Sequence, residues 1–197
     1  MSILLNALSD HKLIDLLQSG SVGVMPTDTV YGLVCRASDE LAVKRLYQLK
    51  FRENKPGTII ASSIEQLIEI GIKARYLKAI ERFWPNAISV EIPHQVEYLS
   101  QSTGRQAFRV VERPVELLNL LSITGPLLTS SANMPGEEPA GTVSDARNYF
   151  GDSVDFYVDG GDLSGRAPST LIRIVDDAVE ILRDGAVKID EETGKIL

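Results

Sequence analysis

The spacing of apolar and polar residues predicts that helices and strands alternate in the first part of the chain. Apolar residues recur at helical spacing between Ser9 and Gly20, and again between Ser38 and Leu49. Each of these segments opens with polar residues that cap helices well, and the first one ends at a glycine. The largely apolar segment Ser21–Met25 between them predicts a buried strand.

The same periodicities continue through the rest of the chain. Further strands are expected in 58–62, 87–92, 107–111, 126–130, 155–158, 170–174 and 179–183, and further helices in 65–70, 76–84, 115–121 and 143–150. Together these elements predict the α/β class, with one large, open, twisted and mostly mixed sheet flanked by helices. The sequence contains no repeat, low-complexity tract or linker, so a single domain over residues 1–197 is expected.

Composition narrows the class of protein. The chain is 44% hydrophobic and 24% charged, which supplies ample material for a core. Its net charge of -7 argues against broad, nonspecific binding of nucleic acid, which needs a surplus of lysine and arginine on one face. A local basic patch is still compatible with this charge.

Targeting signals and metal motifs are absent from the sequence. The N-terminus lacks the basic start and apolar run of an export signal, and no segment reaches the about 20 apolar residues of a membrane span. A cytoplasmic protein without a membrane partner is therefore expected. The lone Cys35 and the two histidines, His11 and His94, form no cluster at metal-ligand spacing, so no protein metal site is expected.

The stretch VMPTDTVYGLVC, Val24 to Cys35, interrupts an apolar run with polar residues. Pro26 is followed by Thr-Asp-Thr, and the apolar pattern resumes near Tyr31. The default interpretation is a strand that ends in a turn. The alternative is that the polar side chains face a ligand, with Asp28 a residue to which no role can be assigned.

A basic segment stands out in this acidic chain. The stretch Lys44–Gly57 holds Lys44, Arg45, Lys50, Arg52 and Lys55 against a single acid, Glu53. Basic residues at a helix C-terminus complement the helix dipole, although one or two of them suffice for that. Alternatively, the last three cations converge on a polyanion such as a nucleotide triphosphate.

A second polar cluster follows an apolar strand. In LLTSSANMPGEEPAG the residues Thr129, Ser130, Ser131 and Asn133 lead into a loop rich in proline and glycine. Small hydroxyl and amide side chains at a strand end suit contacts to a phosphate, a ribose or an amino acid. They also form turns with their own backbone, and composition alone favours that interpretation.

Three more candidates carry weaker signals. Arg109 lies within an apolar strand and needs a partner if its face is buried, Ser169 lies in a glycine-rich loop, and Arg183 ends a strand. Each is also compatible with an ordinary surface position. The sequence contains neither a P-loop, nor a dinucleotide-binding glycine fingerprint, nor a nucleophile elbow, so any nucleotide is bound in another way.

Taken in order, these segments resemble the YrdC/TsaC family of threonylcarbamoyl-AMP synthases. PTDTVYGL is similar to the opening motif of that family, KFRENK to its basic K-x-R motif with a following lysine, and SSAN to its S-x-N motif. The shorter signatures FWP, AFR, DGG, PSTLI and ILRDGA also stand in the family's order. The resemblance extends from about Gly20 to Lys188 and points to the short, single-domain type.

The resemblance implies a large, basic, concave cavity and a nucleotidyltransferase reaction. In that reaction L-threonine, bicarbonate or CO2, and ATP give threonylcarbamoyl-AMP and pyrophosphate. The product serves the threonylcarbamoyl modification of the tRNA adenosine next to the anticodon, and other proteins carry out the transfer. Mg2+ is expected with ATP, held mainly by phosphates and water.

The resemblance also implies the role of each site residue. ATP is expected to bind Lys50, Arg52, Lys55, Ser131, Asn133 and Arg183, with Lys50 and Arg52 catalytic, and threonine to bind Thr27, Tyr31, Arg109, Thr129 and Ser169. The chain departs from the family pattern at Asn86–Ala87, which replace a Gly-Pro, and in a basic loop that is one residue shorter before Lys55. The alternative is a paralogue that binds RNA or a nucleotide without turnover.

Overall fold

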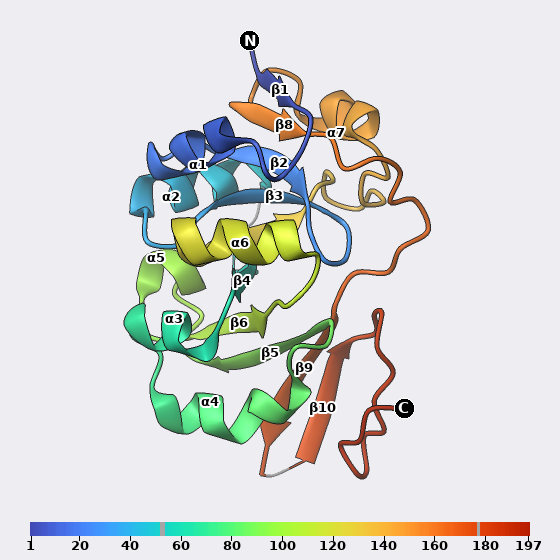
Figure 1. The fold of residues 1–197 in the computed structure, drawn as a ribbon. Helices are drawn as coiled ribbons and strands as arrows, with labels where there is room; N and C mark the ends of the chain where they lie inside the picture. Colours follow the sequence, from blue (N-terminus) through green and yellow to red (C-terminus); the bar gives the residue numbers. More distant parts are fainter. Residues whose placement is uncertain (52–53, 177) are drawn as a thin grey trace.

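The computed structural model describes residues 1–51, 54–176 and 178–197. Its strands are β1 (Ile3–Leu5), β2 (Gly23–Pro26), β3 (Tyr31–Arg36), β4 (Thr58–Ala61), β5 (Ile88–Pro93), β6 (Arg105–Val110), β7 (Leu127–Ser131), β8 (Phe156–Val158), β9 (Thr170–Val175) and β10 (Ala178–Arg183). They join into one sheet in the order β1-β8-β2-β3-β7-β4-β6-β5-β9-β10 (Figure 1). Parallel and antiparallel neighbours both occur, so the predicted mixed sheet is confirmed.

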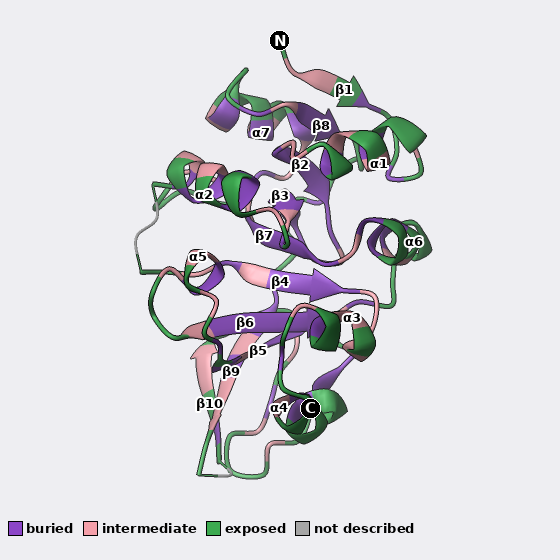
Figure 2. Cartoon of the chain, turned by 90° about the vertical axis from the view of Figure 1, so that its left-hand side faces the viewer, coloured by how far each residue is buried: buried purple, intermediate pink, exposed green. Residues whose placement is uncertain are grey.

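Helices cover both faces of this sheet. They are α1 (His11–Gln18), α2 (Glu40–Leu49), α3 (Ile64–Glu69), α4 (Ala74–Ile80), α5 (Glu97–Ser100), α6 (Val115–Thr124) and α7 (Val143–Phe150), with a 3-10 turn at Glu81–Phe83. Helices α1 and α6 lie on one face, and α2, α5 and α7 lie on the other (Figure 2). Among the described residues, no helix is long and apolar enough to cross a bilayer.

Alternating side chains of the central strands supply two separate cores. Val24 packs with the α2 side of the sheet, whereas its neighbour Met25 packs with α1 and α6. Leu33 and Val34 on β3 divide in the same way. The uninterrupted apolar runs in the sequence therefore reflect strands that are buried on both faces.

Several predicted elements are confirmed together with their physical basis. Asp10 caps α1 by accepting a hydrogen bond from the Lys12 amide at 2.9 Å, and Asp39 caps α2 in the same way. Helix α7 has the predicted bounds, because Thr142 and Asp145 form a reciprocal capping box at its start.

The differences from the prediction are few. The expected helix 76–84 is a shorter α4 followed by the 3-10 turn, and β1, β3 and α5 are not among the predicted elements. Strand β1 has three residues and α5 has four, too few to show a periodicity. Strand β1 exists because Ile3 to Leu5 pair with Phe156 to Val158 on β8, a partner far along the chain.

Candidate functional site

A cavity of about 530 Å³ lies where the ends of several sheet strands meet. Its walls come from the turn between β2 and β3, from residues 54–58, from the ends of β7 and β10, from β5 and β6, and from the loop before β9. We call it the inner cavity. Its lining includes Thr27, Lys55, Arg109, Thr129, Ser131, Ser169 and Arg183, all of which are candidates from the sequence.

Four of the five candidate threonine contacts line the inner cavity, and Tyr31 does not. Tyr31 is fully buried, and its hydroxyl donates to the Gly161 carbonyl at 2.9 Å and accepts from the Gly160 amide at 2.8 Å. Burial raises the pKa of this phenol, which keeps it protonated as a donor. In this structure Tyr31 anchors the glycine loop at Gly160 and Gly161, and its contact with threonine stays a prediction.

The polar turn between β2 and β3 is both a turn and a cavity wall. The Thr27 hydroxyl donates to the Val30 carbonyl at 2.7 Å and accepts from the Thr29 amide at 3.2 Å. These bonds hold the turn closed, as the default interpretation of the sequence predicts. The same geometry places Thr27 in the cavity lining, so the two interpretations of this stretch are compatible.

Asp28 gains a role as the partner of a buried arginine. Arg109 on β6 is only 3% exposed, and its Nη2 donates to Asp28 Oδ1 at 2.7 Å. Its Nη1 donates to the Ser89 hydroxyl on β5 at 2.9 Å. A buried guanidinium requires such partners because desolvation of an unpaired charge is costly. The sequence predicts that Arg109 needs a partner but does not identify Asp28 or Ser89.

Ser169 and Arg183 are hydrogen-bonded to each other in the wall of the inner cavity. Arg183 Nη2 donates to the Ser169 carbonyl at 2.7 Å and to the Ser169 hydroxyl at 3.2 Å. The Ser169 hydroxyl also lies 2.8 Å from the Ser89 hydroxyl. A candidate ATP contact and a candidate threonine contact are therefore in direct contact with each other.

Lys50 joins the basic segment to the SSAN segment. As the C-cap of α2, Lys50 extends its ammonium group to the Ser131 carbonyl at 2.9 Å and to Asn133 Oδ1 at 2.8 Å. It also donates to the Asn133 carbonyl. Ser131 Oγ donates to the same amide oxygen at 2.7 Å. Three candidate ATP contacts thus form one cluster, with the Lys50 residue 3% exposed.

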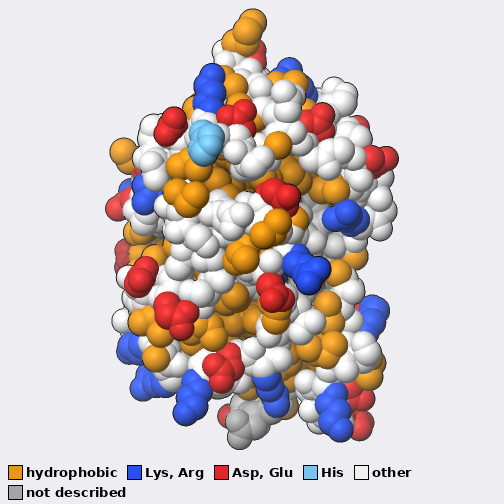
Figure 3. Space-filling view, viewed as in Figure 1, with side chains coloured by type: hydrophobic (Ala, Val, Ile, Leu, Met, Phe, Trp, Pro, Cys, Tyr) orange, Lys and Arg blue, Asp and Glu red, His pale blue; other side chains and the backbone are white. Residues whose placement is uncertain are grey.

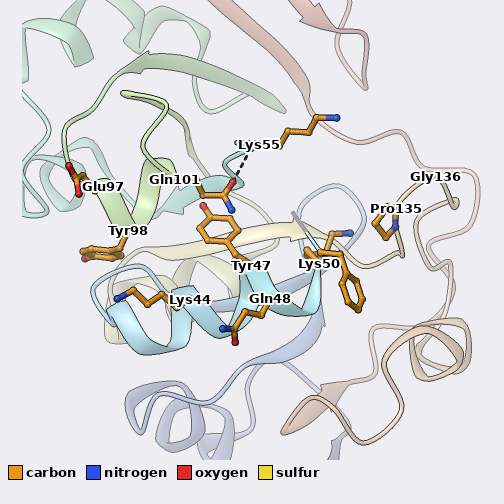
Figure 4. Close-up of a pocket in the computed structure, with 11 residues that line it drawn as sticks. Lys44, Tyr47, Gln48, Lys50, Lys55, Glu97, Tyr98, Gln101, Pro135 and Gly136 are labelled. Carbon is orange, nitrogen blue, oxygen red and sulfur yellow. Dashed lines mark hydrogen bonds between the residues drawn. The ribbon is translucent and has the colours of Figure 1, made fainter. Parts of the chain in front are cut away.

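A second, outer cavity of about 950 Å³ lies beside this cluster (Figure 4). Helices α2 and α5 wall it with Lys44, Tyr47 and Tyr98, and Lys50 reaches it from the end of α2. Lys55 lines both cavities, and its backbone amide donates to the Gln101 side chain at 2.9 Å. The predicted catalytic Arg52 lies outside the described residues.

The replaced dipeptide Asn86–Ala87 stands in the turn that precedes β5. The described lining of the inner cavity does not include these two residues. The Ala87 carbonyl accepts a hydrogen bond from the Thr170 amide at 3.0 Å, directly after Ser169. This departure from the family pattern therefore touches the site through the backbone of the Ser169 loop.

The combined chemistry of the site suits anionic, oxygen-rich ligands. Hydroxyl groups, an amide and the cations Lys55, Arg109 and Arg183 surround the inner cavity. Its one described acid, Glu91, is paired with Arg173 at 3.3 Å. The described residues contain no group of three or more acids, histidines or cysteines that could hold a metal ion. This arrangement can catalyse a reaction by aligning its ligands and by stabilising negative charge that develops on them.

Comparisons with known proteins give a consistent result. The family model Sua5_yciO_yrdC, described as "Telomere recombination", matches residues 15–185. A protein of Mycobacterium tuberculosis named "Putative threonylcarbamoyl-AMP synthase" is 35% identical over 182 residues, which cover 88% of this chain and 82% of that protein. The Hahella chejuensis protein named "Threonylcarbamoyl-AMP synthase" is 33% identical over 83% of this chain and 91% of its own length.

Two solved structures of Sua5 from P. abyssi share the fold, one of them complexed with L-threonine. Their TM-scores are 0.85 and, for the threonine complex, 0.80, at 26% and 25% identity. They cover 100% and 96% of this chain, but the chain spans only 65% and 58% of theirs. Sequence motifs, fold and relatives agree, and the chain belongs to the Sua5/YciO/YrdC family.

Proposed function

We propose that the chain is an L-threonylcarbamoyladenylate synthase, which joins L-threonine, bicarbonate or CO2, and ATP and releases pyrophosphate. The main support is the convergence of candidate threonine and ATP contacts around the inner cavity and the adjoining Lys50 cluster. Similarity to curated synthases and to a Sua5 structure complexed with L-threonine also supports the proposal.

In this proposal the inner cavity holds threonine. Arg109 and Ser169 face its carboxylate end, with Thr27 and Thr129 as further walls. Threonine needs a neutral amine to take up CO2. Lys55 and Arg183 make an ammonium unfavourable there, because the neighbouring acids are already paired, Glu91 with Arg173 and Asp28 with Arg109.

In this proposal ATP contacts Lys50, Lys55, Ser131, Asn133 and Arg183, with Arg52 as a further predicted contact. The carbamate oxygen attacks the α-phosphorus, and pyrophosphate leaves. Lysine and arginine side chains stabilise the charge that develops on the phosphate oxygens. Mg2+ would enter with ATP, bound mainly by phosphate and water.

The wider role follows from the same reaction. Threonylcarbamoyl-AMP would serve as the donor for the modification of the tRNA adenosine next to the anticodon, in the cytoplasm, with other proteins performing the transfer. The names of the relatives support threonylcarbamoyl-AMP as the product, and the tRNA step rests on the family resemblance.

A pyrophosphate-release assay tests the proposal. Pyrophosphate should form from ATP only when both threonine and bicarbonate are present, and serine or alanine should replace threonine poorly. Release that does not depend on threonine would point to a different adenylate-forming reaction. A complete lack of release, with threonine bound, would exclude the enzyme function.

The second candidate is an RNA- or nucleotide-binding paralogue without turnover. It is favoured by the outer cavity, where Lys44, Lys50 and Lys55 lie beside Tyr98. On the face shown in Figure 3, however, basic and acidic side chains are interspersed. A salt titration of RNA binding separates the two: a steep loss of affinity with salt, without pyrophosphate release, would support the paralogue.

A further inference from the structure

A line of hydrogen bonds runs beside the inner cavity from Asp28 to Arg183. Asp28 holds Arg109, Arg109 donates to Ser89, Ser89 lies 2.8 Å from Ser169, and Ser169 accepts from Arg183. Ser89 is the middle member of this line. It is fully buried, and it belongs neither to the cavity lining nor to the candidate contacts from the sequence.

Counting hydrogens fixes the direction of the bond between the two serines. A hydroxyl has one hydrogen to donate and two lone pairs that accept. Ser89 Oγ accepts from Arg109 Nη1, so its own hydrogen still needs an acceptor. Within the described chain, the acceptor recorded for this buried hydroxyl is Ser169 Oγ. Leaving the hydrogen unpaired would cost free energy, so Ser89 donates to Ser169.

The same count at Ser169 leaves one hydrogen over. Ser169 Oγ accepts from Ser89 and from Arg183 Nη2, which uses both lone pairs. Its own hydrogen is thus left for an acceptor in the inner cavity, which Ser169 lines. The network therefore makes Ser169 a donor to the ligand.

Arg109, like Ser169, offers only hydrogen-bond donors to the ligand. Its Nη1 and Nη2 are used by Ser89 and Asp28, while its Nε is buried without a hydrogen-bond partner among the described residues. The remaining capacity of both side chains is donation alone. A group that only accepts, such as a carboxylate, satisfies these donors, whereas an amide adds hydrogens of its own.

We propose that Ser89 is a positioning residue, which orients the Ser169 hydroxyl and Arg109 as donors and thereby makes this end of the cavity select a carboxylate. The proposal rests on the proposed function in one respect, that L-threonine is the ligand. Ser89 touches neither substrate, and it acts through the two residues that do.

Calorimetric titration with L-threonine and with L-threoninamide tests whether the site prefers a carboxylate to an amide. Wild type should bind threonine more tightly than the amide. Ser89→Ala should weaken threonine binding about tenfold, the scale of one hydrogen bond to a charged group. It should change amide binding less than about threefold, because Ser169 then gains a lone pair that accepts from the amide. Ser89→Thr, which keeps the hydroxyl, should restore the preference for threonine.

Ser100→Ala is the matched control. Ser100 is also a buried serine whose hydroxyl bonds to the protein, but it lies on α5 outside the network. It should leave both affinities unchanged. Equal weakening of both ligands in Ser89→Ala would indicate a merely structural serine and overturn the proposal, as would unchanged binding of both.

The titration and the pyrophosphate assay test the positioning role and the synthase proposal separately. If the carboxylate preference depends on Ser89 but pyrophosphate is not released, the positioning role stands and the synthase proposal fails. If pyrophosphate release requires threonine but Ser89→Ala leaves the preference for threonine over threoninamide unchanged, the synthase proposal stands and the positioning role fails. A wild-type protein that binds no threonine contradicts both.

Discussion

The Lys50 ammonium donates to the Asn133 side-chain oxygen over 2.8 Å and thereby joins the end of α2 to the loop after β7. The two residues lie 83 positions apart in the sequence. The Lys50 residue is 3% exposed, and several oxygens accept from its ammonium group, which holds that group in position. A cation fixed in this way suits the stabilisation of charge that develops during a reaction.

Lys50→Ala should lower pyrophosphate release about 100-fold, the scale for removing one preorganised electrostatic donor. Thermal unfolding should be measured alongside, because the change also leaves the oxygens of Ser131 and Asn133 without a donor. Lys44→Ala is the control, since Lys44 is exposed and paired with Glu40 on the helix surface. The catalytic assignment fails if both variants lose activity equally.

Asp28→Ala should lower the free energy of unfolding by about 3 kcal/mol, because it leaves the buried Arg109 charge without its partner. Asp28→Asn should cost less, since its amide oxygen can still accept from Arg109. The double variant Asp28→Ala/Arg109→Leu should recover part of the loss. Urea unfolding measures all three, and equal values for the two Asp28 variants would contradict the ion-pair explanation.

Asp155→Asn should lower stability at neutral pH, with a difference that shrinks below about pH 4. Burial raises the pKa of the Asp155 carboxyl, but Arg45 and the Val22 amide outweigh burial and lower it. A lowered folded-state pKa contributes stability above the unfolded value and loses it as pH falls through the folded value. Melting temperatures at pH 7 and near pH 3 check this, with the exposed Asp184→Asn as a control of small effect.

The Cys35 thiol should resist alkylation by iodoacetamide in the folded protein and react readily in urea. Cys35 is fully buried on β3, and its burial, with a smaller contribution from Asp39, raises the pKa of the thiol. The thiol form is a weak nucleophile, and the reagent cannot reach it. Mass spectrometry after timed exposure measures the reaction, and rapid labelling in native buffer would show that β3 opens easily.

Local patterns in the sequence predict most of the fold. Helices α1, α2 and α7 have polar caps and a strong apolar periodicity, and both signals lie within the segment itself. Strand β1 has no such signal, because it depends on β8 for its pairing. The prediction therefore fails where an element owes its existence to a distant partner.

The same distinction applies to the site. The motifs predict that Thr27, Arg109, Thr129 and Ser169 share a site, and the described cavity brings them together. The buried residues that hydrogen-bond to Arg109 and Ser169 are harder to predict. Asp28 is 81 positions away from Arg109, and Ser89 lies in an apolar strand whose pairing the sequence does not reveal. One signal was available, since the strand alternates in ISVE and places Ser89 and Glu91 on one face.

The pairing of β9 with β5 has a consequence for the order of folding. Because these strands pair in parallel, with Ile88 opposite Thr170, the Ser169 loop reaches Ser89 only after a contact 80 positions apart has closed. Contacts of this separation form slowly, since the entropy of the long loop is lost before the contact compensates for it. We therefore expect the inner cavity to form late in folding, and only once β9 has been synthesised.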